Sequence, residues 1–340
     1  MVQWMSEKID CSLDSQSKGW GTGASKETLL ERALMLKNIR AFFDARGVIE
    51  VETPLLSRFA TTDPHLHSLS SSFRGRACYL NTSPEYAMKR LLAGWKQSIY
   101  QICKAFRDDE LGINHNPEFT LLEWYRPDYD LSQLMDELAA LINALLPDSK
   151  KQAAFERFSY QQAFEDVADF NPHETTSGEC YQIALNNNVE IPQGLTVVDD
   201  VDNWLDWLLT QMVIPTFKKD RFTFLYDYPA SQCALANIAN NAQQVPVAKR
   251  FELFFGEVEL ANGFNELTNA EEQLQRFQQD NQMRKKAGKA PSVIDENFIA
   301  ALKHGMPECS GVAVGLDRLL MALTNKNNID KVLSFSWGNN

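Results

Sequence analysis

The strands predicted from this sequence follow one another in antiparallel pairs, and this pairing constrains the fold more than any other feature. One pair spans residues 98–106 and 118–125 around a polar loop, and a second spans 251–255 and 258–264 with a turn near Gly256. Further strands are predicted at 48–53, 222–229 and 311–315, and helices at 27–46, 83–92, 131–146, 270–287, 295–304 and 317–323. Because strands adjoin strands instead of alternating with helices, we expect an α+β fold whose antiparallel sheet is flanked by helices.

Length and composition indicate how the chain is organised. It has 340 residues, 44% of them hydrophobic and 23% charged, which is ordinary globular composition. We expect a loose arm at residues 1–26 and one domain at 27–337 that carries an insertion at about 148–220. No apolar run approaches the ~18 residues of a membrane span, and the first residues lack a basic-then-apolar leader pattern. Six scattered cysteines without a CxxC pair add to the prediction of a cytoplasmic protein with no membrane contact.

The acidic charge of the chain is concentrated in that insertion. The formal net charge is -12, and residues 158–217 contain ten Asp or Glu residues but no Lys or Arg. The remainder of the chain is therefore almost neutral. Phosphates would be repelled by such a segment, so it is not expected to bind nucleic acid. It is either a solvated surface insertion or a face that docks a basic patch of a partner or keeps RNA away.

The hairpin at 98–125 carries the first set of candidate site residues. Side chains alternate along a strand, so one face of its second strand presents Phe119, Leu121, Glu123 and Tyr125. A carboxylate, a phenol and an aromatic ring on one face suit a small polar ligand with an amine. The same pattern would also fit a half-exposed sheet.

A second set of candidates lies on the next hairpin, where Glu252 and Glu259 are seven residues apart across a turn. Asn262 and Glu266 follow them. Clustered carboxylates at such a place can hold Mg²⁺, which prefers oxygen ligands and shares them with substrate phosphates. Scattered surface acids are the alternative interpretation.

A third pattern is the small-residue run GVAVGLDR at 311–318. Its small side chains allow close backbone approach, and Arg318 lies at the start of a predicted helix. No GK[ST] sequence follows, so the run is not a P-loop.

In this order, the three patterns resemble the three-motif core of class II aminoacyl-tRNA synthetases. Pro54 follows the first helix-strand unit, Phe106-Arg107 begins the second motif, and the run 315–318 ends the third. Further runs are similar to the lysyl branch: Ser83-Pro84-Glu85, His115-Asn116-Pro117-Glu118-Phe119, and 259–264 with Glu266-Leu267. A lysyl-tRNA synthetase carries an anticodon-binding domain before its first motif, which here begins near residue 27. We therefore expect no anticodon-binding domain and no anticodon-dependent tRNA binding. The chain is most similar to the freestanding paralogues that form the elongation factor P–lysine ligase family.

The resemblance implies an ATP-dependent, AMP-forming ligase. Members of this family activate (R)-β-lysine as an aminoacyl-adenylate and transfer it to a lysine side chain of elongation factor P, the protein partner. A homodimer that buries part of residues 27–56 is also implied. Two alternatives remain open: a truncated lysyl-tRNA synthetase acting on α-lysine, and a non-catalytic sensor of ATP and lysine. A class II asparagine synthetase would not explain the set Glu85, Glu123 and Glu266.

The resemblance, together with the chemistry of the side chains, assigns roles to individual residues. Arg107 and Arg318 would be catalytic, because adenylation needs positive charge on the α-phosphate and on the terminal phosphate. Mg²⁺ would be bound by Glu252 and Glu259. ATP would be contacted by Arg107, Asp108, Asp109, His115, Asn116, Phe119, Glu259, Leu260, Gly315 and Arg318. The amino acid would be bound by Ser83, Pro84, Glu85, Glu123, Tyr125, Asn262, Glu266 and Ala313.

Three positions depart from the lysyl-tRNA synthetase pattern. Ala313 replaces a glycine, and Ser83 replaces a frequent alanine. A methyl group in a tight pocket is worth about 1–3 kcal/mol of discrimination, so Ala313 is expected to disfavour α-lysine. Asp109 replaces the glutamate of the usual Arg-x-Glu sequence and is one methylene shorter, which predicts weaker ATP binding without loss of activity.

Overall fold

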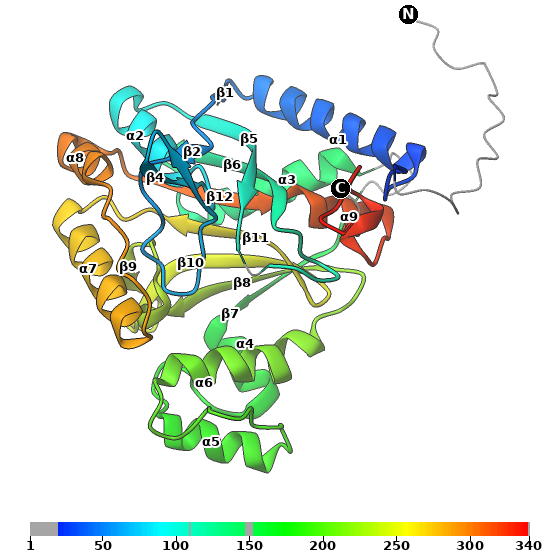
Figure 1. Ribbon diagram of the computed structural model, residues 1–340. Helices are drawn as coiled ribbons and strands as arrows, with labels where there is room; N and C mark the ends of the chain where they lie inside the picture. Colours follow the sequence, from blue (N-terminus) through cyan, green and yellow to red (C-terminus); the bar gives the residue numbers. More distant parts are fainter. Residues whose placement is uncertain (1–19, 109, 147–151, 339–340) are drawn as a thin grey trace, which may run out of the picture.

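One large sheet dominates the architecture of the computed structural model, which describes residues 20–108, 110–146 and 152–338. Its strands are β1 (Ile49–Glu50), β5 (Ile99–Phe106), β6 (Glu118–Pro127), β7 (Phe155–Ser159), β8 (Phe222–Pro229), β9 (Ile238–Asn240), β10 (Pro246–Phe255), β11 (Val258–Asn265) and β12 (Cys309–Gly315). Within the described residues they run in the order β1-β5-β6-β12-β11-β10-β8-β7, with β9 paired to β10 (Figure 1).

The centre of this sheet is antiparallel and its two edges are parallel. Antiparallel pairing links β5 to β6, β6 to β12, β12 to β11, β11 to β10 and β10 to β8. The edge strands β1 and β7 instead run parallel to β5 and β8. The predicted α+β fold with a mainly antiparallel sheet is thus confirmed. The parallel edges were not predicted, because the direction of an edge strand is set by the path of the chain between distant segments.

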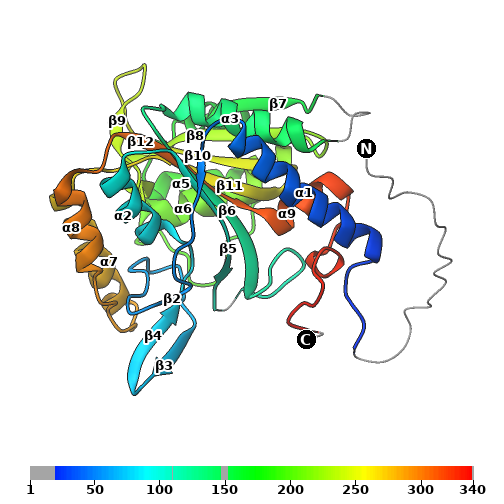
Figure 2. The same cartoon turned by 90° about the horizontal axis from the view of Figure 1, so that it is seen from above.

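The helices lie on both sides of the large sheet and beyond its end. They are α1 (Lys26–Asp44), α2 (Glu85–Trp95), α3 (Leu131–Leu145), α4 (Tyr160–Ala168), α5 (Ser177–Asn186), α6 (Val201–Leu208), α7 (Ala270–Lys286), α8 (Glu296–Gly305) and α9 (Leu316–Thr324). A small sheet of β2 (Leu56–Ser57), β4 (Arg76–Leu80) and β3 (Ser70–Phe73) projects beside them (Figure 2). The described helices include none that is long and apolar enough to cross a membrane.

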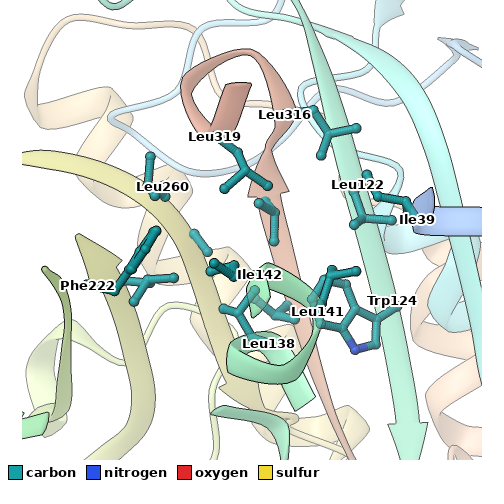
Figure 3. Packing of buried hydrophobic residues seen from close by; sticks show 14 of the residues in the cluster. Ile39, Leu122, Trp124, Leu138, Leu141, Ile142, Phe222, Leu260, Leu316 and Leu319 are labelled. Carbon is teal, nitrogen blue, oxygen red and sulfur yellow. The ribbon is translucent and has the colours of Figure 1, made fainter. Parts of the chain in front are cut away.

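The main hydrophobic core lies between the large sheet and the helices α1, α3 and α9. Leu122 and Trp124 of β6 are fully buried there, against Ile39 of α1 and Leu138 of α3 (Figure 3). Since side chains alternate along a strand, this burial directs Leu121, Glu123 and Tyr125 to the opposite face. The core therefore decides which face of the sheet remains available for a site.

The segment between β7 and β8 folds into α4, α5 and α6 around a hydrophobic core of its own (Figure 1, green helices). This insertion core contains Tyr160, Phe164, Trp204 and Leu208, all fully buried, and it continues onto Leu225 of β8. The acidic side chains of the segment lie around this core. Residues 147–151, at the start of the predicted insertion, and residues 1–19 of the predicted arm lie outside the described residues.

Two predicted element boundaries were wrong in an informative way. Helix α2 begins at Glu85 with Pro84 as its N-cap, whereas the prediction started it at residue 83, and the Ser83 hydroxyl accepts a hydrogen bond from the Glu85 amide at 3.1 Å. It also continues beyond the predicted end at residue 92, through Gly94 to Trp95, and its C-cap Lys96 takes a left-handed conformation with φ 54°. Burial of Leu92 and Ala93 stabilises this last turn, so packing outweighs the low helix propensity of glycine.

Candidate active site

A cavity of about 1470 Å³ opens on the face of the large sheet that α1, α3 and α9 leave uncovered. Strands β6, β10, β11 and β12 form its floor, and side chains of α2, α6 and α7 contribute to its walls. Thirteen of the predicted site residues line it: Ser83, Pro84, Glu85, Arg107, His115, Glu123, Tyr125, Glu252, Glu259, Asn262, Glu266, Ala313 and Arg318. Segments far apart in the sequence are therefore brought together as the motifs predicted.

Three glutamates line one end of this cavity, and we call them the carboxylate wall: Glu85, Glu123 and Glu266. Glu123 is buried on β6, where it accepts hydrogen bonds from the hydroxyls of Ser83 and Tyr125, each at 2.7 Å. Burial, and then the neighbouring charge of Glu85, raises the pKa of Glu123 to about 7. Glu266 is buried at the end of β11, and burial raises its pKa to about 8.

Lys89 lies directly behind the carboxylate wall and was missed from the sequence. Its Nζ is 2.6 Å from Glu85 Oε1 and 2.6 Å from Glu266 Oε2, and only 1% of the side chain is exposed. Burial alone would lower the pKa of Lys89, but the charges of Glu266 and Glu85 outweigh it and raise the pKa. The available signal was its position four residues after Glu85 on a predicted helix, between the apolar residues Met88 and Leu92.

Small residues of β12 let the cavity floor come close to this wall. A Cβ added to Gly311 would lie 2.4 Å from the Tyr125 ring and 2.6 Å from Glu266 Oε1, so no other residue fits at this position. Ala313 pairs with Glu123 on one side and with Asn262 on the other, and it lines the cavity. The predicted close backbone approach at the run 311–315 is therefore found at Gly311.

Cationic side chains gather at the other end of the cavity. Arg318 donates hydrogen bonds to the Glu259 carbonyl at 3.0 Å and to the Asn114 carbonyl at 3.1 Å, and its NH2 lies 2.5 Å from His115 Nε2. Burial, and then the charge of Arg318, lowers the pKa of His115, so the ring is neutral and can accept that contact. Arg107 packs over the Phe119 ring at 5.1 Å and pairs with Glu110 at 3.2 Å, while its buried Nε has no partner among the described residues. An arginine N–H left without a partner in a cavity is suited to an anionic ligand.

The predicted metal ligands lie close to these arginines. Glu252 on β10 is held by Arg250 and accepts a hydrogen bond from Asn262 at 3.4 Å. Burial, and then the charge of Glu252, raises the pKa of Glu259, and both carboxylates line the cavity. Within the described residues no group of three or more His, Cys, Asp or Glu side chains is arranged to hold a metal ion. Two carboxylates in one cavity fit a divalent cation that takes its other ligands from a substrate, as Mg²⁺ does with phosphates.

Five of the predicted ATP contacts do not line the cavity: Asp108, Asn116, Phe119, Leu260 and Gly315. Asn116 is buried, and both ends of its amide are bonded to backbone, donating to the Glu118 carbonyl at 2.6 Å and accepting from the Trp337 amide at 2.8 Å. Asn116 therefore fixes the end of the loop between β5 and β6 against the segment that contains Trp337. Asp109 lies outside the described residues.

Asp317 ties the third motif to the first and was also missed. It is buried at the start of α9, where it accepts a hydrogen bond from Arg32 of α1 at 2.6 Å and one from the Thr120 amide of β6 at 2.6 Å. The adjacent Arg318 is thereby positioned over the cavity. No local pattern could have revealed this, because its partners lie 197 and 285 residues away.

Comparisons with known proteins agree with this geometry. Residues 16–338 match the family model of class II tRNA synthetases (D, K and N). Curated relatives named "Elongation factor P--(R)-beta-lysine ligase" include the protein of Pseudoalteromonas translucida, 46% identical over 93% of this chain and 97% of the relative. The proteins of Hamiltonella defensa, at 44% identity over 94% and 98%, and Yersinia enterocolitica, at 43% over 95% and 99%, carry the same name. The chain therefore belongs to the class II (D, K and N) tRNA synthetase family and, within it, to the family of elongation factor P–(R)-β-lysine ligases.

Proposed function

We propose that this protein activates (R)-β-lysine with ATP and transfers it to a lysine side chain of elongation factor P. One observation carries the proposal: a buried carboxylate wall and an arginine pair, Arg107 and Arg318, line the two ends of a single cavity. Such a cavity can hold an amino acid with two ammonium groups beside a nucleotide triphosphate. Family membership and the names of the relatives point to the same reaction.

The arginines and His115 would stabilise the adenylation step by position and charge. The carboxylate of the amino acid attacks the α-phosphorus of ATP, a P–O bond to the amino acid forms, and pyrophosphate leaves. Arg107, whose Nε has no partner in the described part of the chain, would face the α-phosphate, while Arg318 would hold the terminal phosphate. Neutral His115 would orient Arg318 through their 2.5 Å contact without adding charge. No covalent enzyme intermediate is needed.

Mg²⁺ is the metal that Glu252 and Glu259 fit best. It would offset charge on the phosphates of ATP when bound. Arg250 and Asn262 orient Glu252 from the sheet side, and Arg318 lies 3.7 Å from Glu259 Oε2. Because Glu259 is already flanked by a cation, it can approach Glu252 without full repulsion between the two carboxylates.

The second half-reaction joins the activated amino acid to the acceptor. The neutral ε-amine of a lysine in elongation factor P attacks the carbonyl carbon of the adenylate, an amide bond forms, and AMP leaves with the electrons of the broken C–O bond. The acceptor proton passes to solvent. The carboxylate wall meanwhile retains the two ammonium groups of the bound β-lysine, so the reacting carbonyl stays in place.

We further propose a cytoplasmic homodimer that does not bind tRNA through its anticodon. Two leucines on the outer side of α1, Leu30 and Leu34, are 61% and 57% exposed, and Ile49 of β1 is 41% exposed. These residues fall within the segment 27–56 that was expected to pair. Exposed aliphatic side chains in one region favour burial against a second copy. A monodisperse monomer in light scattering at micromolar concentration would contradict this part of the proposal.

The test of function is amino-acid-dependent exchange of pyrophosphate into ATP, with (R)-β-lysine and α-lysine compared side by side. We expect exchange to favour β-lysine, and the mass of purified elongation factor P to rise by one β-lysyl group when it is added. A strong preference for α-lysine would support a lysyl-tRNA synthetase-like enzyme instead. ATP binding without exchange for either amino acid would support a sensor.

A further inference from the structure

Lys89 is a buried cation that the proposed reaction does not by itself require. It projects from α2 behind the cavity wall and is not among the residues that line the cavity. The rings of Tyr125 and Phe298 have their centroids 6.0 Å from its Nζ. An ammonium group removed from water to this extent is costly unless it is paired, and replacing such a buried pair by apolar side chains is often neutral. Stability alone therefore does not explain why a lysine occupies this position.

The contacts of Lys89 orient two members of the carboxylate wall. Its Nζ forms ion pairs with Oε1 of Glu85 and Oε2 of Glu266, each at 2.6 Å. Each glutamate keeps one oxygen that Lys89 does not use, and both residues line the cavity. The remaining oxygen of Glu266, Oε1, lies over Gly311, at the cavity floor. Lys89 thus pairs with one oxygen of each carboxylate. Among the described residues, the other oxygen of each is left available to a ligand.

The side chains around Lys89 can carry more negative than positive charge. Glu85, Glu123 and Glu266 supply three negative charges when ionised, and Lys89 supplies one positive charge. The other titratable groups beside this cluster include the hydroxyls of Tyr86 and Tyr125 and the thiols of Cys103 and Cys309, and burial raises the pKa of each, so they stay neutral. Once all three carboxyls are ionised, which nearby ammonium groups favour, the excess of two negative charges equals the charge of two ammonium groups.

We propose that Lys89 is a positioning residue for the amino-acid substrate. It fixes the orientation of Glu85 and Glu266 and sets the charge of the carboxylate wall to match a diamino acid with two ammonium groups. This inference rests on the proposed function, because it concerns how the same site recognises β-lysine. Removal of Lys89 leaves three carboxylates without a cation, so they retain protons to higher pH, and a protonated carboxyl cannot pair with an ammonium group.

The experiment compares Lys89→Met with Lys249→Met in pyrophosphate exchange between pH 6 and pH 9.5. Lys249 pairs with Asp227 at 3.0 Å in a partly buried position away from the cavity, so it is a matched control. For Lys89→Met we expect the KM for β-lysine at pH 7 to rise at least ~10-fold while the KM for ATP changes less than about twofold. The rising limb of kcat/KM should move up by about one pH unit or more. Lys249→Met should leave both unchanged.

A double variant separates charge from folding. Lys89→Met with Glu266→Gln removes one charge of each sign from the buried pair, so it restores the excess of two and should fold even if the single variant does not. We expect its rising limb to return to within about half a pH unit of the wild type, with a raised KM for β-lysine. The inference would be overturned if the rising limb of the kcat/KM profile stayed displaced in the double variant. It would also be overturned if Lys89→Met changed neither the KM for β-lysine nor the pH of that rising limb. Failure of the proposed function itself would appear as wild-type protein that shows no β-lysine exchange.

Discussion

The carboxylate wall and the insertion core are both buried, but the wall consists of charged side chains and the core of apolar ones. Glu123 and Glu266 of the wall, and Lys89 behind it, are each at most 4% exposed, and they are held by ion pairs and hydroxyl groups. In the insertion core, Trp204 and Phe164 are fully buried among other apolar side chains. The insertion core contributes stability through apolar burial, which is the dominant favourable term in folding. The wall buries charge, which favours binding of a ligand at the expense of the empty fold.

The largest effect on stability is expected in the insertion core. Trp204→Ala removes a fully buried indole that also donates a hydrogen bond to the Thr196 carbonyl at 2.8 Å. The free energy of unfolding should fall by about 3–5 kcal/mol in urea titrations. Trp207→Ala is the control, because Trp207 lies only half-buried on the same helix and should cost clearly less. A loss below ~1 kcal/mol for Trp204→Ala would show that the insertion core does not stabilise the fold.

The next largest effect is expected on catalysis without a stability change. Arg107→Ala should slow pyrophosphate exchange by about 100-fold or more, because it removes a preorganised cation from the developing charge on phosphate. The midpoint of thermal unfolding should stay within a few degrees, since the ion pair of Arg107 with Glu110 is partly exposed to solvent. Arg157→Ala, which breaks an ion pair with Asp136 away from the cavity, should leave exchange intact. If both variants slowed exchange equally, the assignment of Arg107 to the phosphates would fail.

A smaller effect, specific to the wall, is expected in the pH dependence of stability. The pKa of Glu123 is raised to about 7, so between about pH 4.5 and 7 the folded protein holds a proton that the unfolded chain has released. The contribution of Glu123 to stability is therefore lost as pH rises through this window. Relative to wild type, Glu123→Gln should gain about 1–2 kcal/mol in unfolding free energy from pH 5 to pH 8. Glu308→Gln, at an exposed glutamate, should gain none; an equal gain there would refute the interpretation.

The smallest effect concerns selection between two amino acids. Ala313 lines the cavity between Glu123 and Asn262, where its methyl group narrows the floor. Ala313→Gly should raise the ratio of kcat/KM for α-lysine over β-lysine by about tenfold, because one methyl group in a pocket discriminates by about 1–3 kcal/mol. Exchange assays with both amino acids measure this ratio. An unchanged ratio would mean that the substrate does not reach the methyl group.

The alternation of apolar and polar residues on β6 was sufficient to place Glu123 and Tyr125 on the face opposite Trp124, because a strand has a period of two. The resemblance to class II synthetases, which the order of the three motifs carries, implied that Arg107, Glu259 and Arg318 would line the same cavity. The alternation along a strand is a property of local sequence, and local sequence determined it. The α-helical segments of the main core followed from the spacing of their apolar residues for the same reason.

Tertiary structure alone decided how the charges of the site are paired. Lys89 is four residues from Glu85, but its second partner, Glu266, comes from a strand far along the chain. Asp317 reaches Arg32 and the Thr120 amide only because α1, β6 and α9 meet, and Asn116 is held by the Trp337 amide. Coulombic energies and pKa values depend on distance and burial in three dimensions, which the spacing of residues along the chain does not contain. The sequence therefore determined which charged groups the site contains, whereas the packing of the fold determined their partners and their protonation.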